Sequence, residues 1–273
     1  MGETRQAVAP SVRDACPLSP NHAGGQLRHF APIIFGLSII ALWWVVADMG
    51  ILPTYFLPHP RAVWDTLWSG IADGYLLSAA RETLLAAGLG CLAATIIGLP
   101  LGYSIARSPI VAATLGPYLA ASQAIPAVAL APLLVVWIGY GLVPITVLCT
   151  IIVMFPVVIS TTLGIRELDQ DIVDAARLDG AGRLDLVRSI ELPLAAPAIL
   201  AGIRTGFTLS VTGAVVGEMV MGGDGLGAAL SRGQGSTANV AQLFAVIAIL
   251  IVLAVGIYLL LTYVEKITRK GLS

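Results

Sequence analysis

The sequence predicts an all-α membrane protein that crosses the bilayer six times. Hydrophobic residues make up 57% and charged residues 11% of the chain, against about 45–50% and about 25% in soluble domains. The mean hydropathy is +0.90. Uncharged runs also recur at the length of roughly 20 residues that one bilayer crossing needs. A soluble domain of 273 residues could not bury so much apolar surface.

Composition also excludes several classes of function. The net charge is −1 and no basic cluster is present, so no nucleic-acid partner is expected. The cysteines Cys16, Cys91 and Cys149 have no metal-site or disulfide spacing, and we expect no metal and no cofactor. The chain contains no G-x-x-x-x-G-K-[ST] loop. We therefore expect no ATP hydrolysis and no catalytic residue in this chain.

The uncharged runs place the spans in order. Residues 1–29 are polar and lack the apolar stretch of a cleaved signal, so they are predicted to form a disordered cytosolic tail. Residues 108–165 carry no charge over 58 residues, about 87 Å as one helix, and the turn signal Gly139-Tyr140-Gly141 divides them. The predicted spans are 30–50, 80–106, 112–138, 143–165, 197–220 and 240–263, followed by a cytosolic tail, 266–273.

Two features surround these spans. Residues 61–72 repeat apolar side chains at four-residue spacing beside Trp64 and Trp68, which indicates a short helix on the membrane surface. With both termini in the cytosol, twelve of the 15 Lys and Arg residues lie on the inner side and three on the outer side. This asymmetry supports a multi-pass protein of the cell (plasma or inner) membrane with both ends inside.

One long hydrophilic loop, 166–193, interrupts the apolar pattern. It holds eleven of the 31 charged residues, seven of them acids. Asp169 or Asp171 can cap a helix there, Gly180 can end it in a left-handed turn, and Pro193 is expected to stop a second helix over about 183–190. Ala175, Ala176 and Gly180 leave one face without bulk. Because the inner leaflet is itself negative, so acidic a loop is predicted to dock on protein rather than on lipid.

The same loop carries a family motif. Its residues, in the family's spacing, are Asp174-Ala175-Ala176, Gly180, Ile190 and Leu192-Pro193. This pattern resembles the EAA signature of permease subunits of binding-protein-dependent ABC importers, with Asp174 where the family usually has Glu. The substitution shortens the acid by one methylene.

Further matches resemble the subfamily for nitrate, sulfonate, taurine and pyrimidine-type precursors. The resemblance covers roughly residues 30–265, and the loop motif is its most specific part. The matching segments are Leu57-Pro58-His59-Pro60, Ile125-Pro126, Ala129-Leu130-Ala131-Pro132-Leu133, Trp137-Ile138-Gly139, Gly164-Ile165-Arg166 and Val216-Gly217-Glu218.

The resemblance implies a type I ABC importer permease core. Its loop helix would be a coupling helix in a cleft of a separate ABC ATPase, with Asp174, Ala175, Ala176, Gly180, Ile190, Leu192 and Pro193 as the coupling residues. ABC ATPases act as dimers, so a chain with one such loop is expected to pair with a second permease copy, most simply as a homodimer. An extracytoplasmic solute-binding protein would deliver a small polar or anionic solute.

Three residues are candidates for the solute pathway. Gln123 offers amide hydrogen-bond donors and an acceptor, and Pro126 breaks a helix in the manner tolerated beside a cavity. Glu218 lies among apolar residues near one end of a span. It could line a gate or pore, make a structural hydrogen bond, or face the outer surface.

Three other functions are alternatives to this interpretation. An ion-coupled secondary transporter is the main one, but no internal repeat and no acid at mid-span supports it. A membrane-embedded enzyme lacks a cluster of His, Asp and Glu, because His22, His29 and His59 all lie outside mid-span. A structural subunit without a solute path remains the third.

Overall fold

The structure is a computed structural model. It describes the backbone of residues 24–233 and 239–271, with side chains for 34–233, 239–263 and residue 265. The chain divides into two units, residues 1–51 and 52–273. The predicted tail 1–29 lies outside the described residues up to residue 23, and a helix begins at Gly24.

In the first unit the structure describes the helix α1 (Gly24–Asp48). The sequence is uncharged from Phe30 to Ala47, and most of the described side chains of α1 are exposed. A helix that is apolar on every side is typical of burial in protein or lipid. Helix α1 covers most of the first predicted span.

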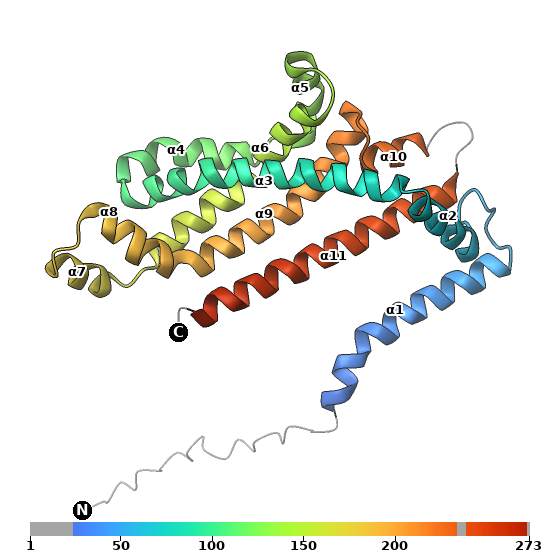
Figure 1. Ribbon diagram of the computed structural model, residues 1–273, viewed down its shortest axis with the longest axis horizontal. Coiled ribbons are helices and arrows are strands. Elements are labelled where there is room, and N and C mark those ends of the chain that lie inside the picture. Colours follow the sequence, from blue (N-terminus) through green and yellow to red (C-terminus); the bar gives the residue numbers. More distant parts are fainter. Residues whose placement is uncertain (1–23, 234–238, 272–273) are drawn as a thin grey trace, which may run out of the picture. The chain divides into compact units, whose positions relative to one another are not determined.

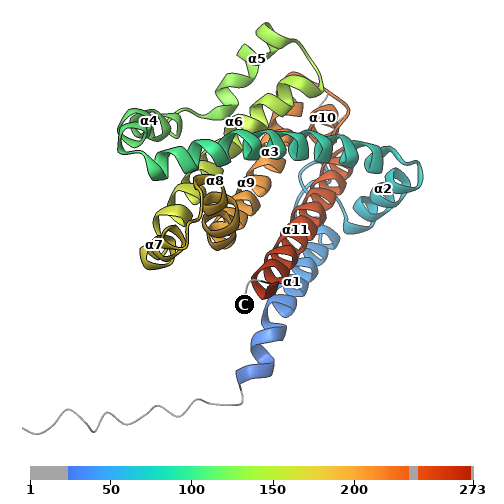
Figure 2. The same ribbon diagram turned by 60° about the vertical axis from the view of Figure 1, so that its left-hand side comes forward.

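The second unit is organised around three helices, α3 (Tyr75–Arg107), α6 (Leu142–Arg166) and α9 (Leu192–Met221), which pack against one another (Figures 1 and 2). Cys91, Ala94, Val153 and Val157 form part of the core between them. Glycines allow the close approach of the backbones. A Cβ atom added at Gly206 would lie 2.7 Å from Cγ1 of Val153, closer than packed carbon atoms can sit.

The predicted span 112–138 is broken next to Pro126, which confirms the prediction that this proline breaks a helix. It forms α4 (Pro109–Ser122), the 3₁₀ turn η1 (Ala127–Leu130) and α5 (Ala131–Ile138), and the chain bends by 86° between α4 and the η1–α5 segment. Pro126 precedes η1 with φ −60° and ψ 111°, and Pro132 lies in the first turn of α5. Neither proline can donate the backbone hydrogen bond that a continuous helix requires.

Three further helices complete the body of this unit. The helix predicted over 61–72 is confirmed as α2 (Pro60–Ala72), where Nδ1 of His59 accepts a hydrogen bond of 3.1 Å from the Arg61 amide, and its place on the membrane surface stays a prediction. The others are α10 (Leu226–Arg232) and α11 (Val240–Gly271), which extends into the predicted tail 266–273. Leu76, Ala79, Leu226, Ala229 and Val246 pack where α3, α10 and α11 meet.

The hydrophilic loop folds into α7 (Gln170–Leu178), α8 (Arg183–Leu186) and a π-helical segment, η2 (Val187–Glu191), that runs directly into α9. The prediction that Pro193 stops the second helix is wrong, because Pro193 lies in the first turn of α9. The Leu192 amide donates to the Val187 carbonyl, five residues back. This wider turn accommodates a proline that would clash with the preceding carbonyl in a regular α-helix.

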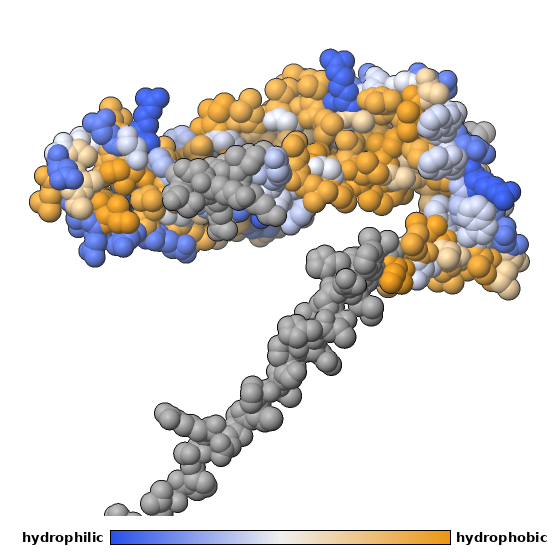
Figure 3. Space-filling view, turned by 60° about the horizontal axis from the view of Figure 1, so that its bottom comes forward, coloured by the Kyte–Doolittle hydropathy of each residue, from blue (hydrophilic) through white to orange (hydrophobic). Residues whose placement is uncertain are grey.

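Four helical segments among the described residues are long and apolar enough to cross a membrane: Tyr75–Arg107, Leu142–Arg166, Arg183–Met221 and Val240–Tyr263. The bent α4–α5 pair makes a fifth if it counts as one span. The described apolar part of α1, Ile34–Asp48, is shorter, so six crossings stay a prediction. Figure 3 shows hydrophobic side chains along the middle of the second unit and hydrophilic ones toward the end that carries α7 and α8. The fold is that of a multi-pass helical membrane protein.

Candidate functional site

The loop helix α7 has a stop signal at each end. Oδ1 of Asp169 accepts a 3.0 Å hydrogen bond from the Asp171 amide, which confirms the predicted cap. Gly180 has φ +88°, which confirms the predicted left-handed turn. The Ala181 amide donates to the Ala176 carbonyl and the Gly180 amide to the Arg177 carbonyl, each at 3.1 Å. Together these two bonds form a Schellman motif.

Helix α7 presents most of its surface away from the protein (Figures 1 and 2). Asp174, Ala175 and Gly180 are exposed, and Val173 is the buried residue that attaches the helix. Leu178 is 89% exposed and Leu184 of the neighbouring α8 is 83% exposed. Large apolar side chains left uncovered among charges are typical of a surface that binds another protein.

The predicted coupling residues therefore form two groups. Asp174, Ala175, Ala176 and Gly180 belong to the projecting helix α7 and its end. Ile190, Leu192 and Pro193 are partly buried where η2 joins α9, and Leu192 packs against Ile165, Ala195 and Ile199. The first group is available to a partner, whereas the second joins the loop to the body of the protein.

Sequence reasoning missed Glu191, which lies between two motif residues. Its side chain is 1% exposed, and its carboxylate accepts a hydrogen bond of 2.7 Å from the Tyr103 hydroxyl and forms an ion pair with Arg107. Both partners belong to the end of α3. The signal that the sequence offers is an acid directly before Leu192-Pro193. The contacts of that acid depend on the π-helical turn, which the order of residues in the loop does not reveal.

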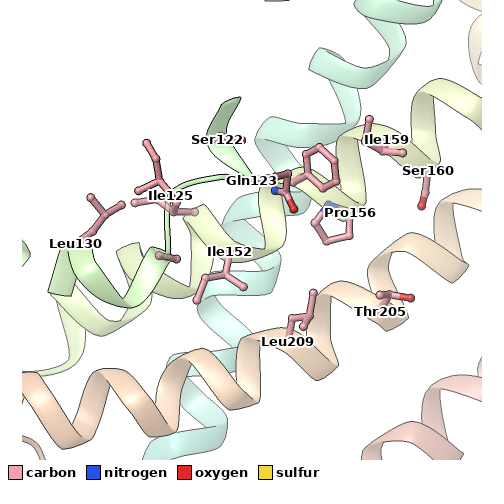
Figure 4. Close-up of a pocket in the computed structure, with 13 residues that line it drawn as sticks. Ser122, Gln123, Ile125, Leu130, Ile152, Pro156, Ile159, Ser160, Thr205 and Leu209 are labelled. Atoms are coloured by element: carbon pink, nitrogen blue, oxygen red, sulfur yellow. The ribbon is translucent and has the colours of Figure 1, made fainter. Parts of the chain in front are cut away.

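A cavity of about 620 Å³ lies beside the break between α4 and α5 (Figure 4). Gln123 and Ser122 come from the end of α4, Ser160 from α6 and Thr205 from α9, and apolar side chains fill most of the remaining wall. The lining residues are Ser122, Gln123, Ile125, Ala127, Leu130, Ile151, Ile152, Phe155, Pro156, Ile159, Ser160, Thr205 and Leu209.

This cavity combines apolar walls with uncharged polar groups. Three hydroxyls and one amide can form hydrogen bonds with a solute, and none of the lining residues is charged. Gln123 thus lines a cavity, and its part in a solute pathway stays a prediction. Pro126 is outside the lining, but its neighbours Ile125 and Ala127 contribute to it.

Glu218 lies in a different place. Its side chain is 2% exposed, and Oε2 accepts hydrogen bonds from the Thr83 hydroxyl at 3.0 Å and the Gly227 amide at 2.7 Å. The same Thr83 oxygen accepts a 2.9 Å bond from the Leu226 amide. These bonds connect α3, α9 and α10 and favour the structural alternative for Glu218. It borders a small separate pocket of about 170 Å³ rather than the cavity at Gln123.

Known proteins resemble this chain in both sequence and fold. Residues 98–270 match the family described as "Binding-protein-dependent transport system inner membrane component". The riboflavin transport system permease protein RibX of Chloroflexus aurantiacus is 36% identical over 231 residues, which cover 85% of this chain and 86% of that protein. The taurine transport system permease protein TauC of Escherichia coli is 30% identical over 194 residues, covering 69% and 70% respectively.

The fold also matches a solved structure, the MetNI methionine ABC transporter in an inward-facing conformation. The TM-score is 0.65 at 21% identity, and the match covers 72% of this chain and 97% of that chain. The family match extends over more than half of the chain and includes α6, the loop helices, α9 and most of α11. The chain accordingly belongs to the inner-membrane components of binding-protein-dependent transport systems and is a permease of the ABC importer type.

Proposed function

We propose that this chain forms half of the solute pathway of an ATP-driven importer and is driven by a separate ABC ATPase that docks on α7. The observation that carries this proposal is the projecting helix α7, capped at both ends, with Ala175 and Gly180 exposed and without bulk. A face without large side chains lets a partner approach the backbone closely. Energy from ATP would then enter a chain that carries no nucleotide-binding motif of its own.

The assembly follows from having one loop per chain. Each ATPase of a dimer needs its own docking helix, so two permease copies would pair as a homodimer and enclose the pathway between them. An extracytoplasmic binding protein would deliver the solute, with both termini of the permease in the cytosol. The charge asymmetry of the sequence supports this orientation.

The cavity beside Gln123 supports a class of solute. Its wall has hydroxyl and amide groups but no charged side chain, so a solute with a net charge would lack an ionic partner there. Relatives carry names of riboflavin and taurine transport. Within the range of sulfonates, taurine, nitrate and pyrimidine-like compounds, a zwitterionic or neutral solute such as taurine or a pyrimidine-like ring suits this cavity best.

Affinity purification from native membranes in mild detergent, followed by mass spectrometry, tests the assembly. We expect an ABC ATPase and an extracytoplasmic binding protein to accompany the chain. Binding assays on that second protein, with taurine, an alkyl sulfonate, nitrate and a pyrimidine-like compound as probes, would then identify the solute. Recovery of the chain without an ATPase, under conditions that preserve other membrane complexes, would contradict the proposal.

A further inference from the structure

The loop that carries α7 is attached to α3 at both of its ends. On the first side Arg166, the last residue of α6, donates a hydrogen bond of 3.2 Å to the Ile105 carbonyl. On the second side Glu191, the last residue of η2, reaches Tyr103 and Arg107. All three partners lie in the last two turns of α3. The flanking helices α6 and α9 are thus not the only elements that hold the loop.

The attachment through Glu191 is specific in its geometry. Tyr103 and Arg107 are four residues apart, so they share one face of α3 and grip the two oxygens of one carboxylate. The Glu191 side chain is 1% exposed and that of Arg107 is 26% exposed. A buried carboxylate is costly unless its hydrogen bonds and its ion pair are kept together. Separating Glu191 from α3 is therefore costly, and the two segments should move together.

The end of α3 leads directly to the cavity wall. Ser108 is the single extended residue after α3, with φ −121° and ψ 113°, and Pro109 begins α4. Helix α4 ends at Ser122, which lines the cavity together with the next residue, Gln123. One extended residue and one helix thus separate the attachment of Glu191 from the polar groups of the cavity. A single residue between two helices can act as a hinge.

We infer that Glu191 is a positioning residue: held by Tyr103 and Arg107, it transmits movement of the loop helix α7 through the end of α3 and the hinge at Ser108 to α4. This inference rests on the proposed docking of an ATPase on α7. The loop is also continuous with α6 and α9, which can carry its movement directly, and the attachment through Glu191 adds a third route. Nucleotide binding at the ATPase would then shift the cavity wall between two arrangements.

The test uses the complex of the full chain with its ATPase in proteoliposomes. A cysteine at Ser122, in a chain whose other cysteines are replaced by alanine, reports on α4 through its rate of reaction with a water-soluble maleimide. The rate is compared without nucleotide and with ATP plus vanadate. In the otherwise unchanged chain we expect nucleotide to alter the rate by about fivefold or more, a typical allosteric effect.

Two conservative variants weaken the attachment of Glu191 to α3. Tyr103→Phe removes one hydroxyl, and Glu191→Gln keeps the shape of the side chain but removes its charge. In both, we expect the response of residue 122 to nucleotide to fall below about twofold, while the ATPase still co-purifies in normal amount. A role in stability alone would lower the yield of the complex without removing the nucleotide response.

Glu265→Gln serves as the matched control. Glu265 forms an ion pair of 2.7 Å with Arg204 that joins α11 to α9 and does not include α3. This variant should keep the full nucleotide response. If both test variants keep it as well, the inference is overturned while the proposed function stands. If no ATPase assembles with the unchanged chain, the proposed function fails, and the inference fails with it.

Discussion

At the scale of single residues, two buried carboxylates connect different pairs of elements. Glu218 accepts hydrogen bonds from Thr83 and from the Gly227 amide, and so holds α10 against α3 and α9. Glu191 instead joins the loop to α3 through Tyr103 and Arg107. Glu218 stabilises a junction near the end of α9, and Glu191 connects the segment just before α9 to the end of α3.

Replacing Glu218 tests the structural role. Glu218→Ala leaves the Gly227 amide without its acceptor and leaves the Thr83 hydroxyl with its 3.2 Å bond to the Ala79 carbonyl, so we expect a loss of about 1–3 kcal/mol in the free energy of unfolding. Glu218→Gln keeps one carbonyl oxygen as acceptor and should lose less than half as much. Unfolding by denaturant in detergent micelles, followed by tryptophan fluorescence, measures both. Equal stability of the two variants would contradict the role of these hydrogen bonds.

The sequence pointed to Glu218 but not to its role, because a carboxylate in an apolar segment has the same pattern whether it faces a pore or a buried amide. Its partners come from residues 83 and 227, far apart along the chain. Gln123 was easier to place, because Pro126, three residues further along the chain, marks a break in a helix, and the cavity lies at that break.

At the scale of elements, the contact of α3 with α6 depends on glycine. A Cβ atom at Gly102 would lie 2.7 Å from Cβ of Thr161 and 2.8 Å from the Val158 carbonyl oxygen, whereas one at Gly88 meets no atom within 4 Å. The two glycines belong to the same helix. They form a matched pair for testing the packing.

Gly102→Ala should therefore destabilise the protein by about 1–3 kcal/mol, because the backbones of α3 and α6 must move apart. Gly88→Ala should be neutral or slightly stabilising, since alanine favours a helix more than glycine does. The temperature at which each detergent-solubilised variant loses its monodisperse peak in size-exclusion chromatography measures the difference. A larger loss for Gly88→Ala would refute the close contact of α3 with α6 at Gly102.

The turn after α7 provides a second matched pair. Gly180 and Gly74 have φ of +88° and +75°, and an added Cβ at either position meets no atom within 4 Å. An arginine strains the backbone similarly at both sites, by roughly 1–2 kcal/mol. Only residue 180 lies beside the proposed docking face.

We expect Gly180→Arg to abolish co-purification of the ATPase, while the protein still inserts into the membrane and remains monodisperse. Gly74→Arg, which has the same strain, should retain the ATPase. Pull-down from membranes through a tag on the permease compares them directly. Retention of the ATPase by both variants would mean that the end of α7 is not part of the interface.

The elements also show where sequence patterns reach their limit. The cap at Asp169 and the left-handed turn at Gly180 could be predicted because they depend on neighbouring residues alone. The break at Pro126 was predicted as well, whereas its angle of 86° and the continuation of the helix through Pro193 could not be. Both depend on how backbone groups freed by proline are accommodated in the folded chain, and the composition of the segment does not record this.

At the scale of the whole molecule, the cavity predicts which positions water can reach. Ser160 and Thr205 line it from two different helices. Ile251, an exposed residue of α11, lies outside its lining and on an apolar helix. In a membrane, the first two should contact the solute pathway and the third should contact lipid.

Single cysteines at these positions should differ in reactivity. We expect Ser160→Cys and Thr205→Cys to react with a charged, water-soluble thiol reagent at least about tenfold faster than Ile251→Cys, because the thiolate that reacts forms only where water is present. Labelling in native membranes, quantified by mass spectrometry, gives the rates. Similar rates at all three positions would argue against a water-filled pathway beside Gln123.

The all-helical membrane class could be predicted from composition because the demand for internally paired backbone groups in lipid leaves few alternatives. The permease function followed from the resemblance of the loop motif to that of a known family, and the family match confirms it. The cavity could not be predicted in full. Its wall combines α4, α6 and α9, and only the packing of the three helices brings Gln123, Ser160 and Thr205 together.

The π-helical segment η2 has a consequence for rotational phase. Each residue of an α-helix turns the chain by about 100°, so one extra residue in a wide turn rotates everything before it relative to α9. The five residues Val187–Glu191 thus set the direction, around the axis of α9, in which α7 and α8 leave the membrane-spanning body. Deleting one of these five residues would leave α7, α8 and α9 unchanged in sequence, but it would turn the docking face of α7 to another direction around the axis of α9.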